Sequence, residues 1–421
     1  MLFRRLSKLL PAALAFGQLA GGIGDARADE PWLNLFDPDR AEISGFVEAE
    51  LRIFPEDGLS NSQDYHLDVS GAVRPEFYLE WGDYSLIATP FFRADQQDSK
   101  RTHGDIREFL FQTLGDDWEF RVGIGQVFWG VTEARHVVDI INQSDLVEDP
   151  KGEEKLGQPL LNFTLLRDWG TLDLFVLPGF RERTFPGKSG RLRTTPRPDT
   201  DRSAIYESGL EQAHVDFAVR YSNTFGAWDL GLSHFYGTSR DPVFVSDFNR
   251  DGERILIPRY DIINQTGLEL QYVRGSTAWK GEAFLREGQG DPYVAVTAGL
   301  EHTLHGVFDT DVDLGLLAEY LYESRSCCRE NGTVFFNPFE YDIMLGLRAA
   351  LNDPQDSKGL ITMVFDLDSP AKILQLEASR RLGDRMRLAL EGNFFIDIPE
   401  QDPLFTVRRD DFLQLKLQYY F

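Results

Sequence analysis

One segment of the sequence carries oxygen-bearing side chains at the spacing of a calcium site. Asp247, Asn249 and Asp251 stand at alternate positions ahead of Gly252, as in the first half of an EF-hand loop, where carboxylate and amide oxygens bind Ca²⁺. Pro258 occupies the twelfth position, where that loop has a bidentate glutamate, and the flanking sequence predicts no helices. Two interpretations therefore stay open, a calcium-bound external loop and an acidic turn without metal.

A second set of ionisable side chains lies within an unusually apolar segment. Glu133, Arg135, His136 and Asp139 are interspersed with valine, alanine and isoleucine in residues 131–141. The apolar residues recur at helical spacing, so this stretch predicts an amphipathic helix. Acidic, basic and imidazole groups on one segment would filter a charged solute if they faced a water-filled passage.

Motifs for catalysis are absent from the sequence. It contains no Gly-x-Ser-x-Gly, no His-Glu-x-x-His and no phosphate-binding glycine loop. A Ser/His pair assembled from separate strands stays open as a hydrolase alternative. Cys327 and Cys328 are adjacent, so they form no disulfide framework; a vicinal disulfide stays open, and two ligands are too few for a zinc site. We expect no enzyme and no cofactor other than the calcium considered above.

The charge balance and hydropathy exclude two broad classes of protein. The 43 Lys+Arg residues against 68 Asp+Glu give a formal net charge of −25, which argues against a nucleic-acid partner. The mean hydropathy of −0.31, with no apolar run of spanning length beyond the N-terminus, argues against a helical membrane protein. A membrane barrel stays compatible with these values, because its interior is polar.

The N-terminus reads as a secretory signal. Three basic residues precede an apolar stretch at 9–19, and residues 26–28 form a small-residue cleavage site. We expect a signal peptide at 1–28, a periplasmic lead-in at 29–41 and a barrel at 42–421.

Beyond this point the sequence repeats strands of about ten residues whose side chains alternate between apolar and polar. Only 84–93, 105–114 and 360–367 alternate poorly. We expect an all-β fold, a transmembrane antiparallel up-and-down β-barrel of about 18 strands, with apolar residues facing lipid. The clearest apolar face is that of the last strand, formed by Leu413, Leu415, Leu417, Tyr419 and Phe421.

The connections between these strands alternate in length. Tight turns are predicted at 82–83, 115–117, 168–170, 225–226, 274–275 and 383–384. Long polar connections are predicted at 55–65, 127–157, 180–211, 238–263, 323–337 and 398–409. Short periplasmic turns and long external loops are typical of outer-membrane barrels, and this arrangement predicts that both ends of the chain lie on the periplasmic side. Within the loops, 181–202 is rich in arginine, glycine and proline, which predicts low order and a solvated segment or one that attracts phosphates and anions.

Charged residues concentrate on the strand faces that we assign to the lumen, since charges facing lipid would be costly. They either filter solutes through the field they create or neutralise one another and stiffen the wall. The candidates for lining the pore from the wall are Arg74, Glu76, Arg121, Arg220, Lys280, Glu282 and Arg286.

Two features resemble known bacterial barrels. The last strand ends in two tyrosines and Phe421, and it resembles the C-terminal signature of bacterial outer-membrane β-barrels, in which a terminal aromatic residue is read by the barrel-assembly machinery. Residues 125–142, with Trp-Gly followed by Asp-Ile-Ile-Asn, look like a motif of uncharacterised porin-like families. The resemblance implies a Gram-negative outer membrane, with lipid and lipopolysaccharide as partners.

We therefore expect a porin-like channel for a small hydrophilic or amphipathic solute. A barrel of this size leaves an aqueous lumen unless loops fill it. Segment 127–157 either folds into the lumen as a constriction or packs on the rim. In the first case we expect Glu133, Arg135, His136 and Asp139 to line the passage. The alternatives are a non-conducting barrel that binds surface polysaccharide or lipid or serves assembly, and an outer-membrane hydrolase. The sequence leaves the solute and the oligomeric state open.

Overall fold

The computed structural model describes residues 40–325, 328–330 and 333–421. The predicted signal peptide, the lead-in up to residue 39 and Cys327 lie outside the described residues. Within the described part of the chain, no helix is long and apolar enough to cross a membrane.

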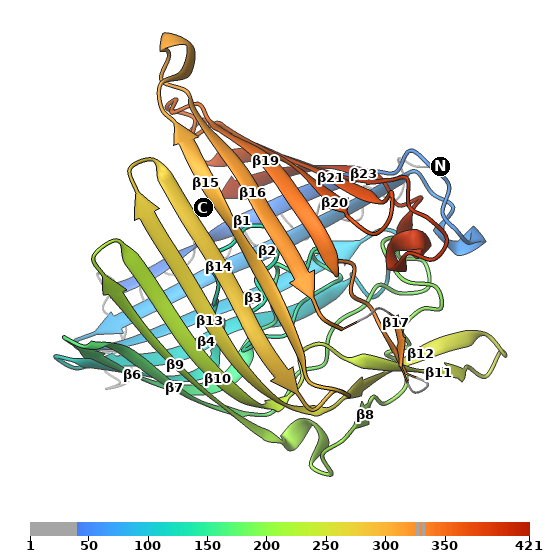
Figure 1. Cartoon of the computed structure of the whole chain (residues 1–421), viewed down its shortest axis with the longest axis horizontal. Helices are drawn as coiled ribbons and strands as arrows, with labels where there is room; N and C mark the ends of the chain where they lie inside the picture. The colour runs from blue at the N-terminus through green and yellow to red at the C-terminus, as the bar shows by residue number, and fades with distance from the viewer. Residues whose placement is uncertain (1–39, 326–327, 331–332) are drawn as a thin grey trace, which may run out of the picture. The chain divides into compact units, whose positions relative to one another are not determined.

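An 18-stranded antiparallel sheet closes on itself to form a barrel (Figure 1). The last strand, β23, pairs with β1, with Phe46 opposite Tyr420 and Ile53 opposite Leu413, so the sheet has no free edge. The predicted fold and strand number are confirmed, and the poorly alternating stretches are strands too. In order, the barrel strands are β1 (Ala41–Ile53), β2 (Leu67–Trp81), β3 (Tyr84–Asp95), β4 (His103–Leu114), β5 (Trp118–Gly125), β6 (Gln158–Arg167), β7 (Gly170–Pro178), β9 (Val215–Phe225), β10 (Trp228–Thr238), β13 (Ile262–Arg274), β14 (Thr277–Glu287), β15 (Tyr293–Leu304), β16 (Asp313–Glu323), β19 (Tyr341–Ala350), β20 (Lys358–Asp366), β21 (Lys372–Leu382), β22 (Met386–Ile396) and β23 (Phe412–Tyr420).

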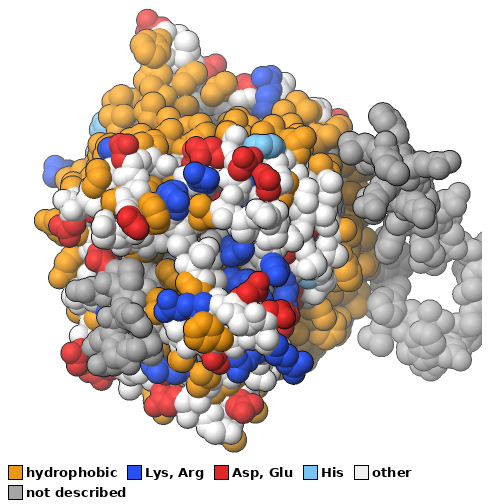
Figure 2. Space-filling view, turned by 90° about the vertical axis from the view of Figure 1, so that its right-hand side faces the viewer, with side chains coloured by type: hydrophobic (Ala, Val, Ile, Leu, Met, Phe, Trp, Pro, Cys, Tyr) orange, Lys and Arg blue, Asp and Glu red, His pale blue; other side chains and the backbone are white. Residues whose placement is uncertain are grey.

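The two faces of each strand differ as the alternation predicts. In β23, Leu413 and Leu415 are 37% and 41% exposed on the outer face, whereas Gln414 between them is 1% exposed inside the barrel. An apolar outer face suits lipid, and a polar inner face suits water. Figure 2, which looks onto the end with the long loops, shows hydrophobic side chains along the flanks and charged side chains of both signs on the end itself.

Short turns gather at one end of the barrel. Each of the predicted tight turns lies between two paired strands, and two further connections at this end, 305–312 and 351–357, were not predicted. Gly82, Gly226 and Gly275 have φ between +59° and +65°, in the left-handed region that residues with a Cβ atom avoid. These glycines allow the chain to reverse within two residues.

The long loops form a second, five-stranded sheet that the sequence did not predict. Its order is β17 (Cys328–Glu330), β18 (Thr333–Phe335), β11 (Val243–Phe248), β12 (Arg254–Tyr260) and β8 (Ile205–Tyr206). Strands from three different loops pair there, and Phe185, Phe244 and Leu256 form a small buried core. Pairing between distant loops leaves no local sequence pattern, so these segments read as irregular.

The low order predicted for 181–202 is wrong. Arg191 is 4% exposed, and it bonds Asp410 and the carbonyl of Gln63 while its guanidinium lies over the Phe54 ring. Arginines that looked like solvated charges are bound by carboxylates and carbonyls of neighbouring loops. The arginine side chains of this segment therefore hold the loops together.

The amphipathic helix predicted for 131–141 is also absent; the segment is made of turns and irregular backbone. Several of its backbone N–H groups donate to side chains of the barrel wall. That of Val138, which would bond the Ala134 carbonyl in a helix, donates to Glu282 at 3.4 Å instead.

Candidate functional site

Segment 127–157, between β5 and β6, is called the inserted segment. Its beginning is bound by Glu282 of β14. One carboxylate oxygen of Glu282 accepts hydrogen bonds from the backbone N–H groups of Val131 at 2.6 Å and Thr132 at 2.8 Å, and from the Thr132 hydroxyl at 2.7 Å. Glu282 is 1% exposed. Charge-assisted hydrogen bonds of this kind are stronger than neutral ones, so the carboxylate holds the beginning of the inserted segment to the wall.

Glu319 of β16 binds the next two residues in the same way. Its carboxylate accepts hydrogen bonds from the N–H groups of Glu133 at 2.9 Å and Ala134 at 2.7 Å. Arg135 then forms an ion pair with Glu323, at the end of the same strand, over 3.0 Å. Three successive residues of the inserted segment are thus attached to one wall strand.

Further along, Glu148 attaches the inserted segment to β3 and β4. Its carboxylate lies 2.8 Å from Arg93 and 2.8 Å from His103. Burial alone would raise the pKa of Glu148, but the His103 hydrogen bond and the charges of Arg93 and Arg101 outweigh it and hold this pKa at about 2. Glu148 is therefore a carboxylate at neutral pH.

Lys151 attaches the inserted segment to β21 and β22. Its ammonium lies 2.5 Å from Glu377 and 3.4 Å from Glu391. Burial lowers the pKa of Lys151, but the carboxylates of Glu391, Glu153 and Glu377 raise it by more. Lys151 is therefore a cation that meets two wall carboxylates.

The attachments made by Glu148 and by Glu133 lie on opposite sides of the barrel. Counted around the closed sheet from β1, β4 is the fourth strand and β16 the thirteenth of 18, so they are half a circumference apart. Glu148 contacts His103 on β4, and Glu133 contacts Glu319 on β16. The inserted segment therefore spans the interior of the barrel from wall to wall.

Two cavities of about 570 Å³ each border the inserted segment. The turn-side cavity is lined by residues near the short turns, such as Lys358 and Arg387, and the loop-side cavity by residues of the long loops, such as Arg240 and Leu404. The residues that line both cavities are Glu133, Pro150, Lys151, Glu153, Leu360 and Glu377.

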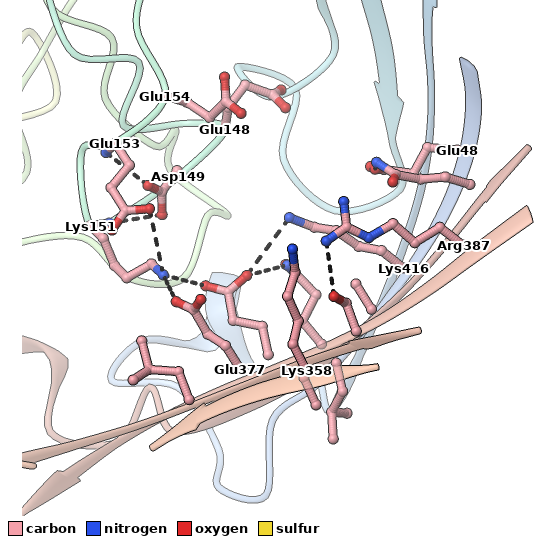
Figure 3. A pocket seen from close by; sticks show the side chains of 18 of the residues that line it. Glu48, Glu148, Asp149, Lys151, Glu153, Glu154, Lys358, Glu377, Arg387 and Lys416 are labelled. Carbon is pink, nitrogen blue, oxygen red and sulfur yellow. Dashed lines mark hydrogen bonds and ion pairs between the residues drawn. The ribbon is translucent and has the colours of Figure 1, made fainter. Parts of the chain in front are cut away.

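Charged side chains of both signs line the turn-side cavity (Figure 3). Lys358, Arg387 and Lys416 project from β20, β22 and β23, and the acidic side chains of the inserted segment lie across the cavity from them. Burial raises the pKa values of Glu153 and Glu154. Because Glu377 and Glu391 lie on the same wall and Lys151 on the inserted segment, both surfaces carry charges of both signs.

The loop-side cavity combines arginines with an apolar patch. Asp241 accepts hydrogen bonds from Arg183 at 2.8 Å and Arg286 at 3.0 Å. Burial raises the pKa of Asp241, but these two arginines lower it by more, so it stays well below its usual range. The other part of the lining is apolar and includes Phe339, Phe395 and Leu404.

Several solved structures share this architecture. A BenF-like porin from Pseudomonas fluorescens Pf-5 superposes with a TM-score of 0.53 at 8% identity, covering 91% of this chain and 97% of that one. OccK2 (OpdF) of Pseudomonas aeruginosa gives 0.51 at 11% identity, covering 91% and 96%. OccAB3 of Acinetobacter baumannii gives 0.50 at 10% identity, covering 90% and 99%.

The chain has the fold of a bacterial outer-membrane porin. No family model matches the sequence, and no curated protein matches it either. The porin fold agrees with the outer-membrane barrel class that the terminal strand and the strand pattern predicted.

In this porin fold, the four residues predicted on the inserted segment come together. Glu133, Arg135, His136 and Asp139 all line the loop-side cavity, and Glu133 lines the turn-side cavity as well. Asp139 is nearly buried and pairs with Lys155 over 3.2 Å.

The residues predicted on the wall have more varied positions. Arg74 lines the turn-side cavity and Arg286 the loop-side cavity, while Glu282 binds the inserted segment. The others form pairs along the wall and line neither cavity: Glu76 with Arg74 at 3.7 Å, Arg121 with Glu119 at 3.1 Å, Arg220 with Glu269 at 2.7 Å, and Lys280 with Glu301 at 3.2 Å. For these residues, charges that neutralise one another along the wall are a better interpretation than charges that filter solutes.

Lys151, Glu148 and Arg93 were not among the predicted site residues. Lys151 and Glu148 lie in the polar half of the inserted segment, which reads as an ordinary loop. Arg93 lies in β3, whose poor alternation concealed its inward face. Pro150 and Gly152, on either side of Lys151, were the one local signal in the sequence, because proline and glycine favour a tight turn.

The calcium prediction falls on the hairpin between β11 and β12. The Asn249 side-chain oxygen accepts hydrogen bonds from the N–H groups of Asp251 at 3.0 Å and Glu253 at 2.9 Å, and Asp247 pairs with Arg202 at 2.7 Å. Among the residues described, no group of three or more His, Cys, Asp or Glu side chains could hold a metal ion. Calcium binding here stays a prediction, in which the ion would have to displace Arg202.

Proposed function

We propose that this chain is an outer-membrane channel through which small hydrophilic or amphipathic solutes diffuse, narrowed by the inserted segment. The observation that carries the proposal is the pair of cavities within the barrel, one on either side of the inserted segment, which share Glu133, Lys151 and Glu377 as lining. A solute that moved from the loop end to the turn end would pass these side chains.

The linings support a polar or amphipathic solute. Charged side chains of both signs border the turn-side cavity, and the loop-side cavity adds an apolar patch. Passage of a bulky apolar molecule through such surroundings would leave many of these charges poorly solvated. We propose no catalytic role.

Single-channel conductance in planar bilayers tests the proposal, with the wild type beside a deletion of residues 131–139. We expect stepwise conductance in the wild type and larger steps after the deletion. Steps only after the deletion would mean that the inserted segment closes the barrel until a ligand or partner opens it. Absence of conductance in both proteins would contradict the proposal. It would favour a non-conducting barrel that binds surface polysaccharide or lipid or serves assembly, with the five-stranded sheet as its binding surface.

The proposed partners are outer-membrane lipid, lipopolysaccharide and, through Phe421, the barrel-assembly machinery. A screen with ester and lipid substrates tests the hydrolase alternative. Turnover by the wild type, lost on substitution of a single serine or histidine, would contradict the absence of a catalytic role.

A further inference from the structure

Two ion pairs connect the inserted segment to the wall at the junction of the two cavities. Lys151 lies 2.5 Å from Glu377, and Glu133 lies 2.6 Å from Arg348. In the first pair the inserted segment supplies the cation, and in the second it supplies the anion. The junction therefore contains two groups of each sign, each facing a partner of the opposite sign.

These two pairs differ from the other attachments in their contact with water. The wall side chains of these pairs, Glu377 and Arg348, are 45% and 38% exposed, whereas that of Glu282, which binds the beginning of the inserted segment, is 0% exposed. Their partners on the inserted segment, Lys151 and Glu133, are 16% and 29% exposed. Ion pairs in contact with water are weak and exchange readily, because water competes for each charge. The buried attachments hold the inserted segment in place, and the junction pairs are the ones that a solute can replace.

A second carboxylate stands behind each junction cation. Lys151 is 3.4 Å from Glu391, and Arg348 is 3.4 Å from Glu301. When a solute separates a junction pair, the cation is left with the more distant carboxylate at 3.4 Å and the freed carboxylate needs a new cation, so each half gains from a closer partner of opposite charge. The solute must also leave no charge of its own unpaired in the narrow space, because unpaired charge away from bulk water is costly.

We propose that the junction favours zwitterionic solutes that carry an ammonium and a carboxylate on one small molecule. The solute carboxylate binds Lys151 and its ammonium binds Glu377, so that both halves of the separated pair regain a partner; Arg348 and Glu133 offer the same exchange. An anion or a cation of similar size satisfies only one half, and a neutral solute satisfies neither. This inference rests on the proposed channel function and names its substrate class.

Proteoliposome swelling tests the inference with free alanine as the zwitterion and lactamide as a neutral molecule of similar size. Both cross without a counter-ion, so their rates compare directly. We expect the wild type to pass alanine faster than lactamide by roughly fivefold, which corresponds to about 1 kcal/mol. The variant that neutralises both pairs, Lys151→Met with Glu377→Gln and Arg348→Met with Glu133→Gln, should pass the two solutes at similar rates. A variant of either pair alone should show an intermediate preference for alanine, and conductance in potassium chloride is recorded for each.

A matched control is the pair Lys372–Asp397, which is also exposed, with atoms 2.9 Å apart, and which lines neither cavity. Lys372→Met with Asp397→Asn should keep the preference for alanine. Heat-modifiable mobility in gels checks that every variant forms a barrel. Equal alanine and lactamide rates in a wild type that conducts potassium chloride would overturn the inference and leave the channel function standing. Absence of conductance in both the wild type and the 131–139 deletion would overturn the channel function itself.

Discussion

The carboxylate of Glu282 lies 2.6 Å from the backbone nitrogen of Val131, although the two residues are 151 positions apart in the chain. A buried wall carboxylate therefore holds the beginning of the inserted segment, and it also accepts at 3.4 Å from the Val138 N–H, which a helix would direct to Ala134. Glu319 does the same for Glu133 and Ala134. Contacts with the barrel wall therefore set the course of the inserted segment. Its position in the lumen depends on Glu282 and Glu319, which line neither cavity.

Replacing Glu282 by glutamine should loosen the inserted segment. A neutral amide oxygen accepts more weakly than a carboxylate, and hydrogen bonds to charged groups contribute roughly 1.5–3 kcal/mol each. We expect noisier and larger conductance steps, together with faster protease cleavage within 127–157. Glu269→Gln is the matched control, because Glu269 is a buried wall carboxylate of the adjacent strand that pairs with Arg220. Equal noise in both variants would contradict the anchoring role.

Acid should release the second half of the inserted segment. The pKa of Glu148 is about 2 in the folded protein and about 4.5 without its partners, so its contribution is fully present above pH 4.5 and is lost as the pH falls towards 2. The difference corresponds to on the order of 3 kcal/mol. Conductance recorded from pH 6 down to 2 should change in this window in the wild type, and Glu148→Gln should have lost that change. A pH profile identical in both proteins would refute this prediction.

Loss of the proton from His136 should loosen the inserted segment as the pH rises, whereas protonation of Glu148 loosens it as the pH falls. Burial lowers the pKa of His136, but its contact with Glu282, along with the charge of Asp139, raises it by more, so the net shift is upward from 6.5. A raised pKa means that the protonated form stabilises the fold below the unfolded value and that this contribution is lost as the pH passes the folded one. We expect the open-channel noise to increase above neutral pH in the wild type. In His136→Asn the noise should be high at every pH, and a noise level that still rises with pH would count against this role.

Replacing Phe421 should impair assembly of the barrel in cells more than it impairs the stability of the folded protein. Its N–H donates to the carbonyl of Gly45 over 3.1 Å at the β1–β23 closure, while its ring is 46% exposed. We expect Phe421→Ala to reduce the amount of folded barrel in cells severalfold, yet to refold in detergent about as well as the wild type. Heat-modifiable gel mobility measures both. Equal losses in cells and in detergent would mean that the residue contributes only to the closure.

The sequence by itself determined the barrel. The alternation of Leu413, Gln414 and Leu415 is a local property with a period of two, and it specifies which face of a strand meets lipid. Turn glycines such as Gly82 are likewise local signals. Together they predicted the strand number and the sorting of short turns and long loops. They singled out Glu133 and its neighbours as candidates but left open whether their segment enters the lumen or packs on the rim.

Only the tertiary structure decided how the interior is arranged. Residues 131–141 have a helical pattern, but contacts with the wall carboxylates Glu282 and Glu319 accompany an irregular backbone. The Val138 N–H, for example, donates to Glu282 rather than to a helical carbonyl. The pairing of Phe244 with Val334 in the outer sheet, and of Lys151 with Glu377 across the lumen, joins residues far apart in the chain. Such contacts depend on the closed barrel holding distant segments at fixed separations, and no local pattern in the sequence records them.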